Sequence, residues 1–475
     1  MRPPKFNSGG TLAVVCLATA MLMLDMAVVN TALPRIAREL HSGLTGVQWI
    51  VDAYTLALAT VVLTAGSLAD RLGRKRVFAW GMALFTATSL ACALASSIAL
   101  LDAARAWQGI GAAMMFASSL AILADAFPAP AERAKAFAAY GATIGASFAI
   151  GPLAGGALTS WMSWRAVFYV NLPLGLVALA ATSVWLRESH DPSPRRIDRA
   201  GQATLTGGLF LLVLALLRGN QDGWGGALVL AELAGATVLL ALVLAAQARA
   251  REPMLPLGLF RRREFSAAQL AAFAISASFF ALFLYTTLYL QEVLHLSPIQ
   301  AGLVYLPGTI LLFLVSGASA QLTRRVPPAA LIVSGLGLVA GGLALMTIAG
   351  VDSSWTALLP GELVVCFGTG LFNPALAAVA IGSVAEPQSG LAAGVNDAFR
   401  QTGVAVGVAA FGALVPASAA LGHGSAQAYV TGMHHALLIG AGVAACGTVL
   451  SAARLVRRRR SRFEVHAPRP VPELG

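Results

Sequence analysis

The most regular feature of this chain is a series of apolar blocks, each about 20 residues long, separated by short polar turns. An α-helix of that length crosses the hydrocarbon core of a bilayer. We count fourteen blocks and predict a membrane-spanning helix in each. Their approximate bounds are 11–33, 47–69, 77–97, 99–124, 135–160, 166–186, 201–217, 226–248, 265–290, 298–319, 328–350, 356–382, 390–414 and 433–455.

Composition agrees with this pattern. Hydrophobic residues make up 57% of the 475 positions and charged residues only 11%, against about a quarter charged in soluble domains. The first block is not a cleaved signal peptide, because it is too long, has no convincing small-residue cleavage site and is followed by thirteen more spans. The sequence therefore predicts an all-α polytopic membrane protein.

The net charge of +11 does not indicate nucleic acid, because most of the 32 Lys and Arg residues fall in loops on one side of the predicted membrane. Basic loops mark the cytoplasmic side, so we expect a protein of the cytoplasmic membrane with both termini inside the cell. The run Arg457–Arg460 is expected to contact anionic lipid headgroups, and a nucleic-acid-binding tail is the alternative.

Several kinds of chemistry are disfavoured by what the sequence lacks. The four cysteines all lie in apolar blocks, which indicates core residues and neither a disulfide framework nor a metal site. None of the three lysines follows a glycine, so no Walker A loop is available for ATP. No H-E-x-x-H or G-x-S-x-G motif occurs. We expect no metal, no cofactor and no enzymatic activity.

A short basic turn separates the second and third spans. From Gly66 to Val77 it reads Gly-Ser-Leu-Ala-Asp-Arg-Leu-Gly-Arg-Lys-Arg-Val, with Asp70 as its one acid. The turn fills every fixed position of G-x-L-A-D-R-x-G-R-K/R-R and so resembles the signature of major facilitator superfamily transporters at this place. The resemblance implies a cytoplasmic gating turn that includes Gly66, Asp70, Arg71, Gly73, Arg74 and Arg76.

The first span carries an acid, Asp25, inside an otherwise apolar helix. An intramembrane carboxylate is costly and is a functional candidate by default; a structural partner to another polar group is the alternative. The stretch Leu24–Pro34 is similar to the motif L-D-x-T-V-V-N-x-A-L-P of the fourteen-span drug:proton antiporters, of the methylenomycin-resistance type. Asn30 matches the motif, whereas Ala27 stands where the motif has threonine.

The fourth span contains Arg105-Ala-Trp-Gln108-Gly-Ile-Gly-Ala-Ala113, which matches R-x-x-Q-G-x-G-A-A of the same family. Arg105 lies roughly 9 Å and Asp25 roughly 12 Å below the outer end of their spans, so we expect a pair. Burial favours the neutral acid and a nearby arginine favours the carboxylate, so Asp25 is the expected proton carrier. Arg105 as a mere helix anchor is the alternative. Gln108 shares the face of Arg105. Asp52 is expected in a hydrated position near the outer end of the second span, and Asp52, Gln108 and Asn30 are possible proton or substrate contacts.

The fifth span contains Gly151-Pro152-Leu-Ala-Gly155-Gly156. This stretch resembles the motif associated with antiporters of the superfamily, and proline permits a bend in the helix. Ser147 occupies a position where that motif is expected to have a further glycine. The resemblance implies exchange of substrate against an ion and close helix packing at Gly151, Pro152, Gly155 and Gly156.

Spans nine to fourteen resemble a diverged copy of spans one to six, which leaves spans seven and eight as an inserted hairpin. Three polar side chains in the second half are possible proton or substrate contacts: Glu362, predicted roughly 9 Å inside its span, and Asp397 and Arg400, which are three apart and expected to neutralise each other. The expected domains are a bundle at 1–198, the hairpin at 199–250, a linker at 251–263, a second bundle at 264–456 and a basic tail at 457–475.

These features favour a monomeric transporter that works by alternating access of two six-helix bundles about a site at the membrane midplane. The resemblance implies a proton-coupled exporter of amphipathic small molecules, such as drugs, antibiotics or a secondary metabolite. A proton-coupled importer of a nutrient is the alternative. An intramembrane enzyme lacks its motifs, and a receptor would commonly carry a signalling domain, for which no soluble stretch is long enough.

Overall fold

The computed structural model describes residues 8–190, 198–250, 253–323, 325–384, 388–421 and 424–455. Within these ranges the chain is helical and contains no strand. Thirteen helical segments are long and apolar enough to cross a membrane. The remaining predicted span is the polar-rich helix α15 (Ser389–Gly412). The predicted polytopic helical fold is confirmed, and the predicted basic tail at 457–475 lies outside the described residues.

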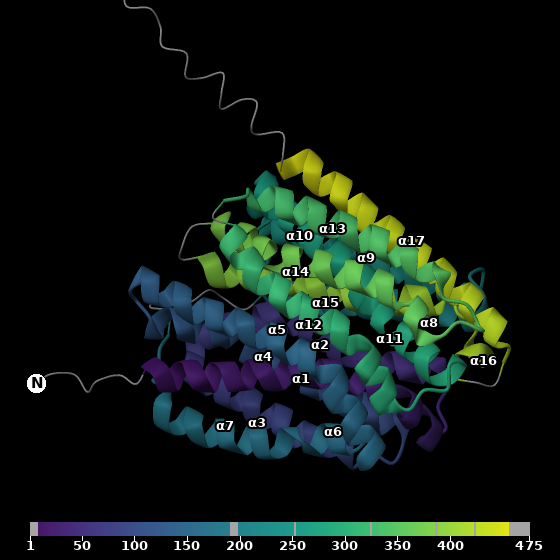
Figure 1. Ribbon diagram of the computed structural model, residues 1–475. Coiled ribbons are helices and arrows are strands. Elements are labelled where there is room, and N and C mark those ends of the chain that lie inside the picture. Colours follow the sequence, from purple (N-terminus) through teal and green to yellow (C-terminus); the bar gives the residue numbers. More distant parts are fainter. Residues whose placement is uncertain are drawn as a thin grey trace, which may run out of the picture.

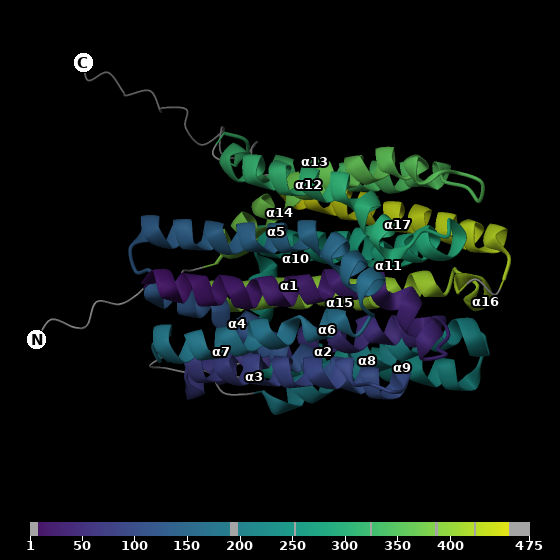
Figure 2. The same ribbon diagram turned by 60° about the horizontal axis from the view of Figure 1, so that its bottom comes forward.

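The first six predicted spans form long helices that run side by side (Figures 1 and 2). The sixth span is divided between the short helix α6 and the helix α7. The bounds are α1 Ser8–Glu39, α2 Leu44–Leu72, α3 Arg74–Ala93, α4 Ile98–Ala126, α5 Pro130–Trp161, α6 Ala166–Tyr169 and α7 Asn171–Trp185.

The next two spans, α8 (Arg199–Asp222) and α9 (Ala227–Arg249), form a hairpin that packs through α8 against α2 and α15. The Asp198 carboxylate caps α8 by accepting from the Gly201 N–H at 2.8 Å. Near the turn of the hairpin, Arg218 and Glu232 form an ion pair of 2.8 Å. Glu232 therefore has its partner within the hairpin, away from the centre of the molecule.

The second half begins with an interrupted helix, whereas the sequence predicts one continuous span at 265–290. Two five-residue π-helical segments, η2 (Ser276–Phe280) and η3 (Tyr289–Val293), interrupt it. Such segments are rare and occur often at functional sites. The other elements are η1 Leu257–Arg261, α10 Arg263–Ile275, α11 Ala281–Leu288, α12 Pro298–Leu322, α13 Pro328–Leu345, η4 Met346–Ile348, η5 Trp355–Ala357, α14 Leu359–Gly382, α16 Ala417–Ala420 and α17 Ala426–Leu455.

Two long helix pairs join the halves: α2 packs along α15, and α5 packs along α12. We call the end of the bundle where α1 begins and α2 meets α3 the basic end, after Arg71, Arg74, Lys75 and Arg76, and the opposite end the far end. The described chain starts and stops near the basic end (Figure 2). The domain limits drawn from the sequence stay predictions.

The glycines of the Gly151–Gly156 stretch hold α5 against both halves. A Cβ atom on Gly155 would lie 2.6 Å from the Val28 carbonyl oxygen of α1. One on Gly156 would lie 2.8 Å from the Ile299 Cα atom of α12. Real side-chain carbons do not approach backbone this closely, so these two positions require glycine. The motif therefore allows α5 to pack closely against both α1 and α12.

This packing predicts that Gly155→Ala destabilises the protein. The added methyl group forces α1 and α5 apart, and overpacking of this kind costs about 1–3 kcal/mol. Gly141→Ala is the matched control, because Gly141 lies on the same helix with nothing within 4 Å of its would-be Cβ. In detergent, the thermal midpoint should fall by a few degrees for Gly155→Ala and stay level or rise for Gly141→Ala. Equal midpoints would show that the close approach is not required.

Candidate functional site

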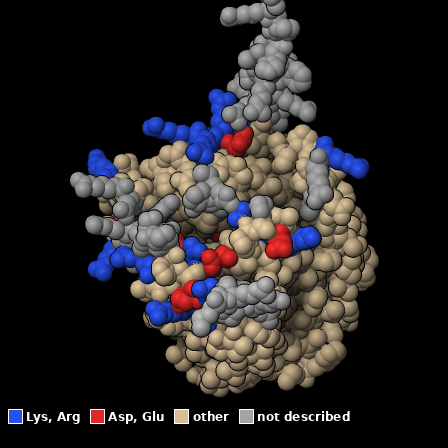
Figure 3. All heavy atoms as spheres, turned by 90° about the vertical axis from the view of Figure 1, so that its left-hand side faces the viewer, with Lys and Arg blue, Asp and Glu red and all other residues tan. Residues whose placement is uncertain are grey.

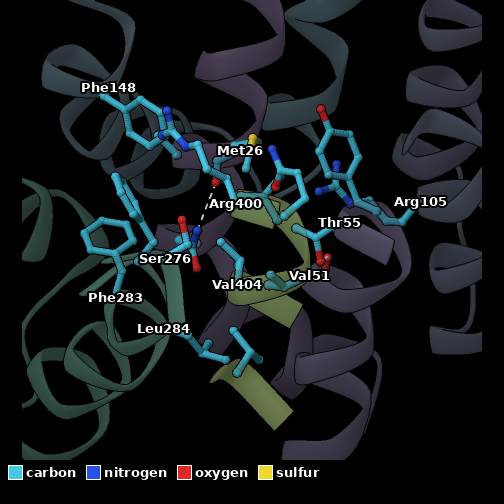
Figure 4. Close-up of a pocket in the computed structure, with 17 residues that line it drawn as sticks. Met26, Val51, Thr55, Arg105, Phe148, Ser276, Phe283, Leu284, Arg400 and Val404 are labelled. Carbon is cyan, nitrogen blue, oxygen red and sulfur yellow. Dashed lines mark hydrogen bonds between the residues drawn. The ribbon is translucent and has the colours of Figure 1, made fainter. Parts of the chain in front are cut away.

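A cavity of about 60 Å³ lies between the two halves. Its walls combine apolar and aromatic side chains with a small set of polar groups (Figure 4). It is smaller than the cavities of several hundred cubic ångströms that hold drug-sized ligands, so this conformation is contracted around its centre. The lining comes from α1, α2, α4, α5, η2, α11 and α15 and includes Met26, Asn30, Val51, Tyr54, Thr55, Arg105, Phe148, Ser276, Phe280, Phe283, Arg400, Gln401 and Val404.

The most polar part of the interior is a cluster around Asp25, directly behind one wall of the cavity. Arg105 Nη1 lies 2.5 Å from Asp25 Oδ2, and neither side chain exposes more than 2% of its area. The other carboxylate oxygen, Oδ1, accepts from Gln108 Nε2 at 3.0 Å and from Asn171 Nδ2 at 2.8 Å. The Ser89 hydroxyl accepts from the same two amides. Asp25 thus has three donors from two helices, α4 and α7, which is the arrangement of a charged carboxylate.

Arg105 connects this cluster with the cavity. Its Nε donates to the Ile50 carbonyl of α2 at 3.1 Å, and its Nη1 also reaches Gln108 Oε1 at 2.7 Å. The guanidinium lies over the Tyr54 ring, with Cζ 4.3 Å from the ring centroid. Because Arg105 and Tyr54 both line the cavity and Asp25 does not, a molecule in the cavity meets the arginine first.

Small residues on α4 bring the cluster together. A Cβ atom on Gly111 would lie 2.8 Å from the Gly81 carbonyl oxygen of α3, and one on Gly109 would lie 2.9 Å from Ala57 of α2. These positions let both neighbouring helices approach α4 closely, which places Ser89 and Ile50 within reach of Gln108 and Arg105. The glycines of Gln108-Gly-Ile-Gly111 thus position the polar residues beside them.

Asp52 differs from expectation. The sequence predicts a hydrated carboxylate, but its side chain is fully buried and neither carboxylate oxygen has a hydrogen-bond partner in the structure. The helix α2 packs along both α4 and α15, so this position is enclosed by helices and not exposed to water. Asn30 does line the cavity, and its amide donates to the Met26 carbonyl at 2.9 Å.

Glu362 also lies elsewhere than predicted. The helix α14 begins only at Leu359, so Glu362 is in its first turn and not well inside a span. It is buried beside Gly308 of α12, its Oε1 has no hydrogen-bond partner, and it does not line the cavity.

Asp397 and Arg400 interact electrostatically, but they are not among the ion pairs within 4.0 Å that the described residues form, so their full mutual neutralisation stays a prediction. Arg400 lines the cavity and Asp397 does not.

Figure 3 looks onto the basic end, and charged side chains of both signs gather on this face. Here Asp70 Oδ1 accepts from Arg74 Nε at 3.2 Å and Nη2 at 3.1 Å, within the turn itself. Glu188, just beyond α7, also contacts the turn: its Oε1 accepts from the Lys75 N–H at 3.1 Å, and its Oε2 lies 3.5 Å from Arg76 Nε. Lys75 Nζ donates to the Ser183 carbonyl of α7 at 2.9 Å. Gly73 has φ +113°, a conformation that favours glycine, and its backbone passes against Glu188.

Sequence reasoning missed Ser89, Asn171 and Glu188. Asn171 is a single amide in the mostly apolar stretch Trp164 to Gly175 at the start of the sixth span, and that isolation is the signal that could have identified it. Ser89 is a single hydroxyl in an apolar block and nothing in its local pattern distinguishes it. In the portion of the chain that is described, no three His, Cys, Asp or Glu side chains gather as a metal site needs.

Comparison with known proteins agrees with this architecture. The tetracenomycin C resistance and export protein of Streptomyces glaucescens is 36% identical over 324 residues, which are 68% of this chain and 60% of that protein. The chain thus matches less than two thirds of that relative's length. The methylenomycin A resistance protein of Streptomyces coelicolor is 33% identical over 96% of this chain and 94% of its own.

Among solved structures, a crystal structure of a peptide transporter superposes with a TM-score of 0.67 at 16% identity, covering 94% of this chain and 95% of that one. At that identity the likeness shows the fold alone. The model of the Major Facilitator Superfamily matches residues 15–408. The chain therefore belongs to the Major Facilitator Superfamily.

Proposed function

We propose that this protein is a proton-coupled antiporter that exports amphipathic small molecules across the cytoplasmic membrane by alternating access. The observation that carries the proposal is the buried Asp25–Arg105 ion pair at the wall of a cavity between the two halves. A proton-coupled importer of a small nutrient is the alternative. The relatives named for resistance to methylenomycin A and for resistance to and export of tetracenomycin C favour export.

The coupling chemistry follows from the donors around Asp25. As a carboxylate, Asp25 accepts from Arg105, Gln108 and Asn171 at once. A proton on either oxygen adds an O–H donor among groups that donate to Asp25, and it removes the negative charge that these contacts stabilise. A neutral Asp25 also leaves the Arg105 charge without its partner in a buried site, which is strongly unfavourable. Protonation of Asp25 therefore drives Arg105 toward the cavity or toward water. This movement alters the positive charge that a substrate in the cavity contacts.

The contacts between the halves support alternating access with the far end closed in this conformation. Gln48 Nε2 of α2 donates to the Tyr285 hydroxyl at 2.9 Å and to the Val408 carbonyl at 3.1 Å. Gln291 Nε2 donates to the Thr31 carbonyl at 2.9 Å, also on the far side of the cavity. On the basic side, α2 and α15 meet through apolar residues such as Leu63 and Ala392. Apolar contacts of this kind separate without stranding buried polar groups, so we infer that the basic side opens next.

Orientation follows from charge. We propose that the basic end faces the cytoplasm, since Lys and Arg accumulate in cytoplasmic loops, and that both termini lie there. We propose that Asp70, which is partly exposed and now paired with Arg74, exchanges partners when the halves close this end. One chain contains the cavity and both halves, so we propose that the functional unit is a monomer.

The polar residues outside the cluster have lesser proposed roles. Gln108 holds the Asp25–Arg105 pair, and Asn30 contacts substrate from the cavity wall. Asp52 and Glu362 are the reserve proton carriers, because both are buried and have carboxylate oxygens without partners. We propose that Gly151, Pro152, Gly155 and Gly156 keep α5 packed as the halves rock.

Energised inside-out vesicles test this function. A panel of amphipathic compounds, including antibiotics and lipophilic cations and anions, is added, and luminal acidity is followed with a pH-sensitive dye. Transported compounds should dissipate part of the proton gradient in wild-type vesicles. Asp25→Asn should abolish this exchange, because the side chain no longer binds and releases a proton. Compounds should also accumulate in the lumen only while the gradient lasts.

Glu232→Gln is the matched control, since it neutralises another intramembrane acid that is paired with an arginine, Arg218, outside the cavity. It should retain exchange. Accumulation that persists without a gradient, or movement of the compounds out of the lumen, would contradict antiport export. Exchange that survives in Asp25→Asn would move the coupling role to Asp52 or Glu362.

The basic turn gives a separate prediction. Asp70→Ala should leave insertion and thermal stability nearly unchanged, because a half-exposed ion pair contributes only up to about 1 kcal/mol. It should slow transport severalfold, because the turn loses the acid that exchanges partners. Asp125→Ala removes an exposed acid from α4, the neighbouring helix, and serves as the control. The measurement is the initial rate of transport at equal protein levels. A normal rate for Asp70→Ala would show that the turn serves only to determine membrane topology.

A further inference from the structure

Arg400 is a second arginine at the cavity, and the coupling pair does not account for it. It extends from α15 toward Phe148, on the side of the cavity opposite Arg105 (Figure 4). In the described structure it lies over the Phe280 ring, whose centroid is 5.8 Å from Cζ, and it interacts electrostatically with Asp397 and Tyr140. No hydrogen bond or ion pair of Arg400 is found there, in contrast to Arg105 with its acid, amide and carbonyl partners.

A guanidinium inside a membrane protein needs a partner, because its charge is costly to bury. Asp397, one helical turn before Arg400 on α15, interacts with it electrostatically, but among the described residues it forms no hydrogen bond or ion pair with Arg400 within 4.0 Å. The described lining of the cavity contains no acid. The contents of the cavity are therefore the available hydrogen-bonding partner for Arg400, and its five N–H donors in a planar fork suit a carboxylate or sulfonate best.

The surroundings of Arg400 define the rest of the ligand. Phe148 and Phe280 have ring centroids 5.6 Å apart, and Phe283 lines the same side. Ser276 belongs to the π-helical segment η2, and its hydroxyl has no partner. Gly403 and Gly407 of α15 bring the helix of Arg400 against this segment: Cβ atoms there would lie 2.7 Å and 2.6 Å from the Phe273 and Ala277 carbonyl oxygens. An anion held by Arg400 would thus have aromatic rings directly beside it.

We propose that Arg400 is the anchoring residue for substrate and that the preferred cargo is an amphipathic organic anion, with an acidic group attached to an aromatic or polycyclic body. The inference rests on the proposed export function and narrows its substrate class. The anionic group binds Arg400 in the second half, the ring system packs on Phe148, Phe280 and Phe283, and Arg105 in the first half remains with Asp25. Anchor and proton carrier then lie on different halves of the protein.

A matched pair of compounds tests this assignment in energised inside-out vesicles of the full-length protein. 8-Anilinonaphthalene-1-sulfonate carries the acidic group, and N-phenyl-1-naphthylamine has the same ring skeleton without it. The ratio of their initial uptake rates, measured by rapid filtration, does not depend on the amount of protein inserted. Wild type should favour the sulfonate. Arg400→Gln should lower the ratio at least about tenfold, the size expected for loss of a charged hydrogen-bonded contact. The ratio for Arg400→Lys should lie between the ratios for wild type and Arg400→Gln.

Two further variants separate the explanations. Asp397→Asn removes the acid on the same helix and should leave the ratio equal or raise it, and Glu232→Gln should not change it. Equal uptake of both compounds by wild type would overturn the assignment, even if Arg400→Gln failed to insert. So would an unchanged ratio in Arg400→Gln, or an equal loss in Asp397→Asn, which would make Asp397 and Arg400 one structural unit. If no compound of the panel shows gradient-driven uptake, the proposed export function itself is contradicted.

Discussion

The arrangement of the first half depends on one buried ion pair. A carboxylate and a guanidinium away from water each lose their hydration, and the loss is tolerated only when they satisfy each other with good geometry and further hydrogen bonds. Asp25 and Arg105 meet this condition through Gln108, Asn171, Ser89 and the Ile50 carbonyl. Removal of either charge strands the other, so the pair is both a structural requirement and a point at which a single proton has a large effect.

The backbone is shaped to make this pair possible. Glycines of α4 bring α2 and α3 to the polar residues, and glycines of α5 bring α1 and α12 together. In a membrane, where lipid is as apolar as a leucine side chain, such close packing and buried hydrogen bonds hold helices together. Among the described residues, polar contacts between halves lie at the cavity and beyond it toward the far end, whereas apolar residues of α2 and α15 share one cluster on the basic side. We propose that this difference lets one side open before the other.

Much of this could be predicted from the sequence because a bilayer imposes strong constraints. The length of the apolar blocks gives the helices, and the depth of Asp25 and Arg105 within their spans leads to their contact. The environment of individual side chains could be predicted less well from the sequence. The position of Asp52 near a helix end predicts contact with water, yet the helices packed around α2 bury it. The spacing of Asp397 and Arg400 predicts a pair, but Arg400 lines the cavity and interacts with Asp397 only at longer range than an ion pair. Such outcomes depend on which helix lies opposite, and no local pattern contains that information.

The central claim is that Asp25 carries the proton that is exchanged for cargo. Infrared difference spectroscopy on the purified, reconstituted protein measures this directly, because a protonated carboxyl group has a C=O stretch that a carboxylate lacks. Lowering the pH should produce a protonated-carboxyl band in wild type and in Glu232→Gln, a transported compound should change that band, and Asp25→Asn should lack this response. The same response in Asp25→Asn would contradict the account, because the coupled proton would then belong to another group.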